Sequence, residues 1–108
     1  MRLIISAAAR RDIASALAWS SARRGPGQRD RYRTLISDAL EDLLEDPRNP
    51  ISRARDEIRP GIRTLHIARH GRPVRHFVVY RGTPEGDLQV IRLLHDAMVL
   101  SGALSQAG

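Results

Sequence analysis

The chain has 108 residues and no cysteine, and its 18 basic residues, all arginine, outnumber its 12 acidic residues to give a formal net charge of +6. The lack of cysteine excludes disulfides and thiolate metal sites and favours a reducing cytoplasm. No apolar run approaches the roughly 20 residues that span a bilayer, and the apolar residues 3–9 are too short for a secretory signal. We therefore expect one cytoplasmic domain, residues 1–108, without membrane contact.

The excess of arginine predicts an acidic partner, because the planar guanidinium matches both carboxylates and phosphates. Charge alone does not choose between nucleic acid and an acidic protein. A GC-rich coding bias would also produce a composition with arginine and no lysine. The missing lysine excludes a lysine as catalytic base.

The first half predicts a short strand followed by a helical hairpin. Residues 2–6 form the strand, and Ser6 is placed to cap a helix over residues 7–24. Gly25-Pro26-Gly27 ends that helix. A second helix is expected over residues 28–45, where apolar residues recur at helical spacing: Tyr32, Leu35, Ile36, Ala39, Leu40, Leu43 and Leu44.

The charges of the second helix oppose its dipole. Arginines crowd its start and acidic residues its end: Arg29, Arg31 and Arg33, then Glu41, Asp42, Glu45 and Asp46. Either the helix tolerates this arrangement, or arginines from elsewhere in the chain or from a partner neutralise the acidic end.

The second half predicts a sheet. A charged, proline-bounded loop over residues 47–60 precedes three strands, at residues 62–69, 74–81 and 88–95, joined by hairpin turns. Residues 97–104 predict a short C-terminal helix or tail capped by Asp96. The fold class is therefore α+β, with an N-terminal strand and a helical hairpin packed on an antiparallel sheet in the order β-α-α-β-β-β.

Alternation divides the strand residues between two faces of the sheet. We expect one face to pack against the helices: Leu65, Ile67, Phe77, Val79, Ile91 and Leu93. We expect the other face to be open: Thr64, His66, His76, Val78, Tyr80, Val90, Arg92 and Leu94.

The mixed character of the open face allows three interpretations. Imidazole, phenol and guanidinium groups around a groove could cleave RNA by acid–base catalysis. The apolar residues could instead dock a peptide, with Arg92 meeting an acidic side chain. These residues could also be ordinary half-exposed sheet residues. His95, beside Asp96, is expected to serve in packing or turn closure.

Nothing in the sequence predicts a metal or cofactor. The four histidines lie on separate elements without ligand spacing. The phosphate-binding loop, the dinucleotide-binding glycine pattern and the serine elbow are all missing.

Several segments together resemble ParE toxins of the RelE/ParE superfamily. Asp12-Ile13, Gly27, Tyr32, Pro47 and Gly61-Ile62-Arg63 match the order of features in that family. The C-terminal signature is carried by residues 75–81 (RHFVVYR) and 90–98 (VIRLLHDAM). The resemblance covers nearly the whole chain.

The resemblance implies the toxin of a type II toxin–antitoxin pair. Its partner would be a ParD-like antitoxin, a ribbon-helix-helix protein whose C-terminal segment wraps the toxin and which alone contacts operator DNA. ParE-type toxins act on DNA gyrase by binding, without chemistry of their own or a cofactor. RelE-type relatives instead cut mRNA on the ribosome, and the alternative is such an endonuclease with His76, Tyr80 and Arg92 as catalysts.

The sequence favours the ParE branch, because it has no lysine base and no tyrosine after Tyr80. On this interpretation four residues of the open face are expected to contact the antitoxin: Val78, Tyr80, Val90 and Arg92. Three residues of the tail are expected to contact the target: Met98, Leu100 and Leu104.

Overall fold

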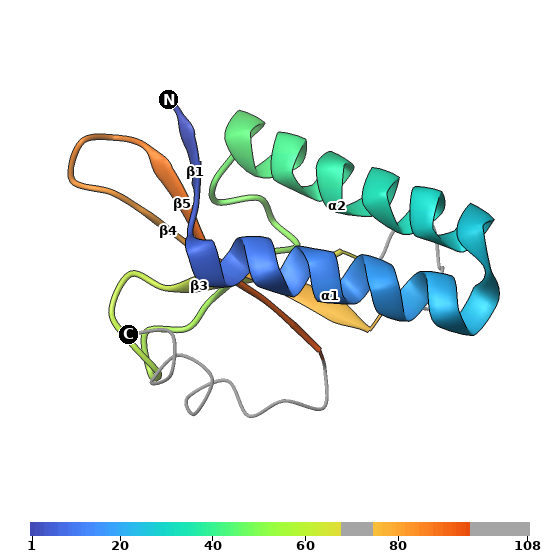
Figure 1. The fold of residues 1–108 in the computed structure, drawn as a ribbon. Helices are drawn as coiled ribbons and strands as arrows, with labels where there is room; N and C mark the ends of the chain where they lie inside the picture. Colours follow the sequence, from blue (N-terminus) through green and yellow to red (C-terminus); the bar gives the residue numbers. More distant parts are fainter. Residues whose placement is uncertain (68–74, 96–108) are drawn as a thin grey trace.

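A computed structural model describes residues 1–67 and 75–95 of the chain (Figure 1). Its elements are β1 (Leu3–Ile5), α1 (Ala7–Arg24), α2 (Pro26–Glu45), β2 (Arg53–Ala54), β3 (Arg63–His66), β4 (His76–Gly82) and β5 (Leu88–His95). This order confirms the predicted α+β class. The expected C-terminal helix at 97–104 lies outside the described residues.

The two helices begin and end where the local chemistry requires. The amide of Ala9 donates to Oγ of Ser6 at 3.0 Å, so Ser6 caps α1 as predicted. Gly25 separates the helices with φ of 90°, a backbone conformation that favours glycine. α2 begins two residues earlier than expected, because Pro26 fits the first helical turn, where its missing amide proton costs nothing. Neither helix within the described part of the chain has the length and apolar character needed to cross a membrane.

The five strands form one mixed sheet in the order β1-β5-β4-β3-β2. β3, β4 and β5 pair antiparallel as consecutive hairpins, as predicted. β1 lies at one edge and runs parallel to β5, with Leu3 opposite Leu88 and Ile5 opposite Val90. The sequence left the position of β1 open, because a parallel pair carries no hairpin turn to mark it.

β2 was not predicted, because it lies inside the segment 47–60 that was expected to be a loop. Its two residues, Arg53 and Ala54, pair with Thr64 and Arg63 of β3. Both β2 residues are exposed. A strand this short and charged has no period of its own, so its pairing with β3 defines it.

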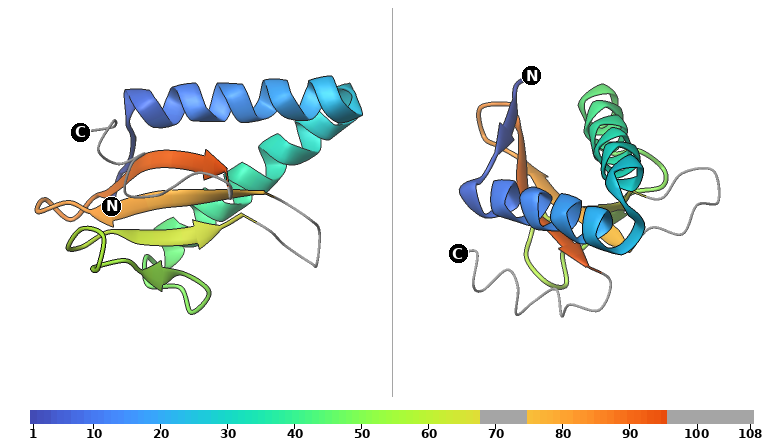
Figure 2. Two further views of the ribbon diagram at one scale, coloured as in Figure 1. Left: turned by 90° about the horizontal axis from the view of Figure 1, so that it is seen from below. Right: turned by 45° about the vertical axis from the view of Figure 1, so that its right-hand side comes forward.

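Both helices lie on one face of the sheet and bury the main core against it (Figure 2). This core contains apolar residues from both helices and from the sheet: Ala9, Ala16, Leu17, Tyr32, Ile36, Ala39, Leu40, Leu43, Leu65, Ile67, Val78, Tyr80, Leu88, Val90 and Leu93. A second cluster contains Ile62, Val79 and Leu94, with Phe77 and Ile91 packed against it. Strand alternation places this cluster on the opposite face of the sheet.

The predicted assignment of strand residues to faces was right for β3 and largely wrong for β4 and β5. Leu65, Ile67 and Leu93 face the helices as expected, and so do Val78, Tyr80 and Val90, which were expected on the open face. Phe77, Val79 and Ile91 belong to the second cluster instead.

Strand register explains this error. Leu65 pairs with Val78, and paired residues share a face of the sheet. Val79 pairs with Arg92 whereas Tyr80 pairs with Val90, so one extra residue bulges between them in β5. A β-bulge shifts the alternation by one residue, and the sequence carries no local mark of it.

Candidate functional site

The N-terminal part of α1 lies along β5 where β1 ends. The amide of Ser6 donates to the carbonyl of Val90 at 3.0 Å, and Oγ of Ser6 donates to the carbonyl of Ile91 at 2.7 Å. Six residues further on, Asp12 accepts a 3.0 Å hydrogen bond from the amide of Leu93. Ser6 and Asp12 therefore bond to the backbone of β5 beyond the end of β1 and satisfy the carbonyls of Val90 and Ile91 and the amide of Leu93.

Asp12 also binds the side chain of Arg92 at two points. Nε of Arg92 lies 2.6 Å from Oδ2 of Asp12, and Nη2 lies 3.0 Å from Oδ1. Only 13% of the Arg92 side chain and 16% of the Asp12 side chain are exposed. The Asp12 hydrogen bond and charge raise the pKa of Arg92 above its ordinary value, against the opposing effect of burial. Arg92 therefore carries a charge that is already paired within the chain.

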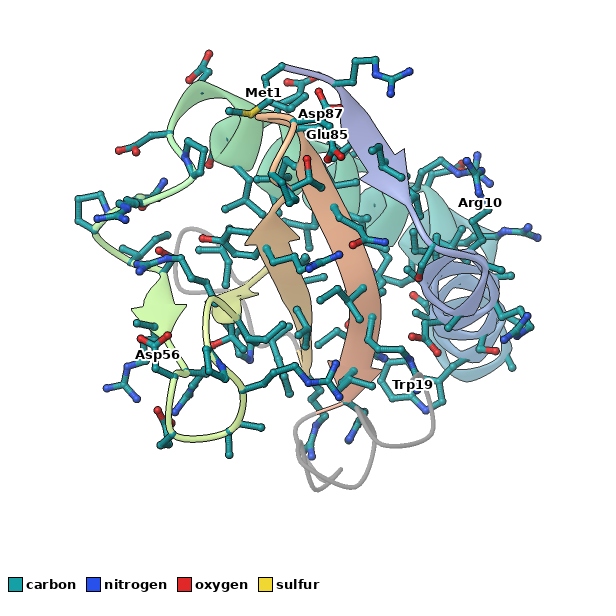
Figure 3. The ribbon with its side chains drawn as sticks, turned by 90° about the vertical axis from the view of Figure 1, so that its left-hand side faces the viewer. Met1, Arg10, Trp19, Asp56, Glu85 and Asp87 are labelled. Atoms are coloured by element: carbon teal, nitrogen blue, oxygen red, sulfur yellow. The ribbon has the colours of Figure 1, made fainter. Side chains whose placement is uncertain are left out.

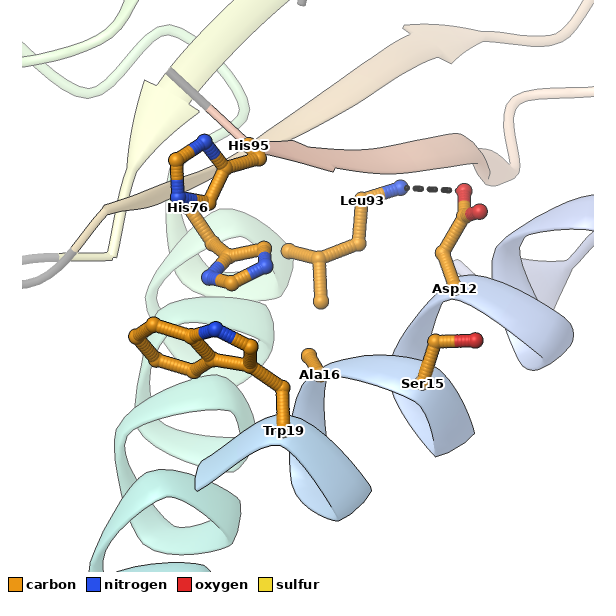
Figure 4. Close-up of a pocket in the computed structure, with 7 residues that line it drawn as sticks. All are labelled: Asp12, Ser15, Ala16, Trp19, His76, Leu93 and His95. Atoms are coloured by element: carbon orange, nitrogen blue, oxygen red, sulfur yellow. Dashed lines mark hydrogen bonds between the residues drawn. The ribbon is translucent and has the colours of Figure 1, made fainter. Parts of the chain in front are cut away.

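A pocket of about 300 Å³ opens beside this ion pair, and we call it the aromatic pocket (Figure 4). Its lining comes from α1, β4 and β5 and consists of Asp12, Ser15, Ala16, Trp19, His76, Leu93 and His95. Figure 4 shows the ring of Trp19 on α1 facing the two imidazoles, with Asp12 at the other end of the pocket.

Four aromatic rings pack together at the base of this pocket. His76 and His95 are paired across β4 and β5, and their ring centroids lie 5.3 Å apart, edge to face. The Trp19 centroid lies 6.0 Å from that of His76 and 6.2 Å from that of His95. The hydroxyl of Tyr32, on α2, shares a hydrogen bond with Nδ1 of His76. This cluster joins both helices to the sheet, with contact geometries typical of packed aromatic side chains.

No group of three potential metal ligands occurs among residues 1–67 and 75–95. The adjacent imidazoles of His76 and His95 have aromatic neighbours, with Trp19 beside both rings and Tyr32 beside His76. Two imidazoles packed edge to face with aromatic rings form a packing arrangement, and a tetrahedral metal site needs three or four converging donors.

The three residues named in the endonuclease alternative, His76, Tyr80 and Arg92, each make a contact with a different part of the chain. His76 is buried against Tyr32. The hydroxyl of Tyr80 donates to the carbonyl of Pro47 at 2.6 Å, and Arg92 is bound to Asp12. General acid–base catalysis needs its groups within hydrogen-bonding reach of the same reacting atoms. In this structure each of the three side chains makes a separate structural contact.

Three of the four residues expected to contact an antitoxin lie in the core. Val78, Tyr80 and Val90 are each 1% exposed, beneath the helices. Their expected exposure was wrong because of the register described above, and a partner would reach them only if the helices moved away. Arg92 keeps a small exposed fraction but is paired with Asp12. Met98, Leu100 and Leu104, expected to contact the target, lie outside the described residues.

Sequence reasoning named Asp12 only within the family resemblance and missed both its pairing with Arg92 and the ring cluster around Trp19. Asp12 lies on α1 between Ala9 and Ala16, which both face the core. A carboxylate beside a buried stripe needs a partner, and this was the available signal. For Trp19 the signal was weaker, since its contacts with His76 and His95 depend on how α1 crosses the sheet.

The helical hairpin on a mixed sheet, with Arg92 paired to Asp12 and the Tyr80 hydroxyl bound to the Pro47 carbonyl, defines a small α+β protein. Residues 3–100 match the family described as the ParE toxin of the type II toxin–antitoxin system parDE. The chain is also 34% identical over 97 residues to Toxin ParE1 of Mycobacterium tuberculosis strain CDC 1551 / Oshkosh, covering 90% of this chain and 91% of that protein. Toxin ParE1 of strain ATCC 25618 / H37Rv matches with the same identity and coverage. The chain therefore belongs to the ParE toxin family of type II toxin–antitoxin systems.

Proposed function

We propose that this toxin inhibits DNA gyrase by binding to it, in the cytoplasm and without catalysing a reaction. Membership of the ParE family supports the toxin role and implies an antitoxin partner. We further propose that this antitoxin is ParD-like, with a ribbon-helix-helix domain through which alone the pair contacts operator DNA.

The observation that carries the non-catalytic part of the proposal is the internal use of the candidate catalysts. Arg92 is charge-paired with Asp12, and the Tyr80 hydroxyl is bound to the Pro47 carbonyl. An arginine that stabilises a phosphoryl transition state must direct its donors at the developing charge. Here the donors of Arg92 point to a carboxylate of the same chain, which favours a structural role.

The charge balance supports a protein partner of opposite sign. The chain carries a formal charge of +6. Complementary charge accelerates association and selects partners. An antitoxin with an acidic toxin-binding segment would therefore associate faster with this toxin and be selected over uncharged partners.

The test is a supercoiling assay with purified gyrase, ATP, relaxed plasmid and the purified toxin. We expect loss of supercoiling together with accumulation of cleaved plasmid after protein denaturation. The matched variant is Tyr80→Phe, which keeps the buried ring and removes only the hydroxyl. It should inhibit gyrase as the parent chain does.

A folded sample that leaves supercoiling unchanged would contradict the proposal. Ribosomes programmed with a defined mRNA would then be incubated with the same sample. Cleavage by the parent chain but not by Tyr80→Phe would establish the endonuclease alternative.

A further inference from the structure

A second pocket of about 300 Å³ is bounded on one side by Ser6, which joins β1 to α1. We call it the arginine pocket. It lies between the loop that precedes β3 and the β4–β5 hairpin, and its lining includes Arg59, Pro60, Ile62, Arg81, Gln89 and Ile91. Ile62 and Ile91 belong to the second apolar cluster, so this pocket lies on the sheet face opposite the main core.

Hydrogen-bond donors dominate the polar lining of the arginine pocket. Nε of Arg81 donates to Oε1 of Gln89 at 2.8 Å, which fixes the guanidinium and uses the amide oxygen. The terminal nitrogens of Arg81 and the amide nitrogen of Gln89 keep their donors. Arg59 is exposed and makes no side-chain hydrogen bond or ion pair within the described part of the chain. Oγ of Ser6, also on the lining, already donates to the carbonyl of Ile91.

The floor of the arginine pocket is apolar. Ile62 is 1% exposed and Ile91 is half-buried against it. A ligand that suits this pocket has at least one negative group for the two guanidinium groups and an apolar group for the floor. Acidic residues interspersed with apolar residues in a polypeptide provide both.

The surroundings of the pocket favour a carboxylate over a nucleic-acid backbone. Asp56 and Glu57 lie in the same loop as Arg59. Glu85 and Asp87 lie in the hairpin that follows Arg81, and Figure 3 labels both. A nucleic acid presents a continuous row of phosphates and needs a matching row of cations. Glu57 is paired with Arg55 and Asp87 with Arg2, so the repulsion of such a row would come mainly from Asp56 and Glu85. A single carboxylate that enters between the two arginines would meet less of this repulsion.

We propose that the arginine pocket binds an acidic, apolar-containing segment of the antitoxin, with a glutamate or aspartate held by Arg59 and Arg81 and a neighbouring apolar side chain on the isoleucine floor. The proposal takes only the existence of an antitoxin partner from the proposed function. It places a protein contact on the sheet face opposite the helices, away from the aromatic pocket.

The test measures binding of a short fluorescein-labelled peptide with one glutamate between two leucines in an otherwise serine-rich sequence, by fluorescence anisotropy with the full chain. A peptide with glutamine in place of glutamate is the ligand control, and an oligothymidylate of similar length is the polyanion control. The double variant Arg59→Glu/Arg81→Glu reverses both pocket charges. The double variant Arg10→Glu/Arg31→Glu makes the same change in net charge at exposed helix positions.

We expect the glutamate peptide to bind more tightly than the glutamine peptide and the oligothymidylate. Its affinity should fall by at least about tenfold in the pocket variant and by much less in the helix variant. Equal losses in both variants, no preference for glutamate, or preferred binding of oligothymidylate would each overturn the proposal. If the pocket variant fails to fold, Arg59→Gln replaces it, since that side chain is exposed and the change removes the charge while keeping a polar, hydrogen-bonding side chain.

The anisotropy assay contains no gyrase, so its result is independent of the proposed target. We expect the pocket variant to lose peptide binding in the anisotropy assay and to keep its inhibition of gyrase in the supercoiling assay. A parent chain that binds the peptide but leaves gyrase active would contradict the proposed function and leave the pocket assignment standing.

Discussion

The carboxylate of Asp12 binds the guanidinium of Arg92 across 80 positions of sequence and accepts the backbone amide of Leu93 as well. Three N–H donors of β5 therefore converge on one side chain of α1. The arrangement fixes the helix along the sheet edge beyond β1, and it closes one end of the aromatic pocket. Arg92 stays protonated in the fold, because pairing with Asp12 raises its pKa further above the accessible range.

We expect Asp12→Ala to lower the free energy of unfolding by about 2–3 kcal/mol. The change removes the acceptor of three hydrogen bonds and leaves Arg92 with a poorly solvated charge. The residual exposure of both side chains keeps the loss below that of a fully buried pair. Urea denaturation followed by circular dichroism measures the difference.

The matched control is Asp30→Ala. Asp30 also faces an arginine, Arg33, but at 3.9 Å and with 79% of its side chain exposed. We expect this change to alter the free energy of unfolding by less than about 0.5 kcal/mol. Similar losses in the two variants would contradict a structural role for the Asp12–Arg92 pair.

The sequence predicted the elements whose limits are set locally. α1 and β5 were predicted at their observed limits, Ala7–Arg24 and Leu88–His95. Ser6 caps α1 and Gly25 follows its last residue, whereas a turn-rich segment precedes β5. Each of these limits therefore depends on residues next to it in sequence.

Features set by distant pairing were not predictable from one sequence. β2 depends on β3 for its hydrogen bonds, and the bulge in β5 depends on how Val79 and Tyr80 align with it. The Asp12–Arg92 pair joins two elements that no local pattern relates. Because the candidate sites were inferred from strand alternation, the single-residue bulge was enough to place Val90 on the wrong face.

We expect Tyr32→Phe to lower the free energy of unfolding by about 1 kcal/mol. Tyr32 and His76 are both buried, and the change removes a hydrogen bond while keeping the ring packing. The ring nitrogens of His76 should shift in nitrogen-15 NMR spectra, because Nδ1 loses its hydroxyl partner. The chemical shifts of the ring nitrogens of His66, which is exposed, should stay unchanged. Unchanged His76 shifts would contradict this contact.

Tyr80→Phe tests whether this tyrosine anchors the segment after α2. Its hydroxyl donates to the carbonyl of Pro47, so its loss should release that segment while leaving the core ring in place. We expect faster hydrogen exchange at the amide of Ser52, which bonds to the Asn49 carbonyl nearby. Amides of β4 that face β5, such as that of Phe77, serve as the internal control. Growth inhibition on expression should persist, and its loss in a folded variant would instead favour a catalytic tyrosine.

The last prediction concerns the start of α2, where no acidic residue or side-chain cap offsets the helix dipole. Arg29 is exposed there, about one turn from the start of the helix at Pro26. Replacing it with glutamate puts a negative charge near the positive end of the dipole and places glutamate four residues before Arg33. We expect Arg29→Glu to raise stability by about 0.3–1 kcal/mol, measured as an increase in thermal midpoint. The gain should shrink in high salt, which screens exposed charges. Arg31→Glu, further from the helix end, should gain less, and an equal gain there would show that reduced net charge, not the dipole, is responsible.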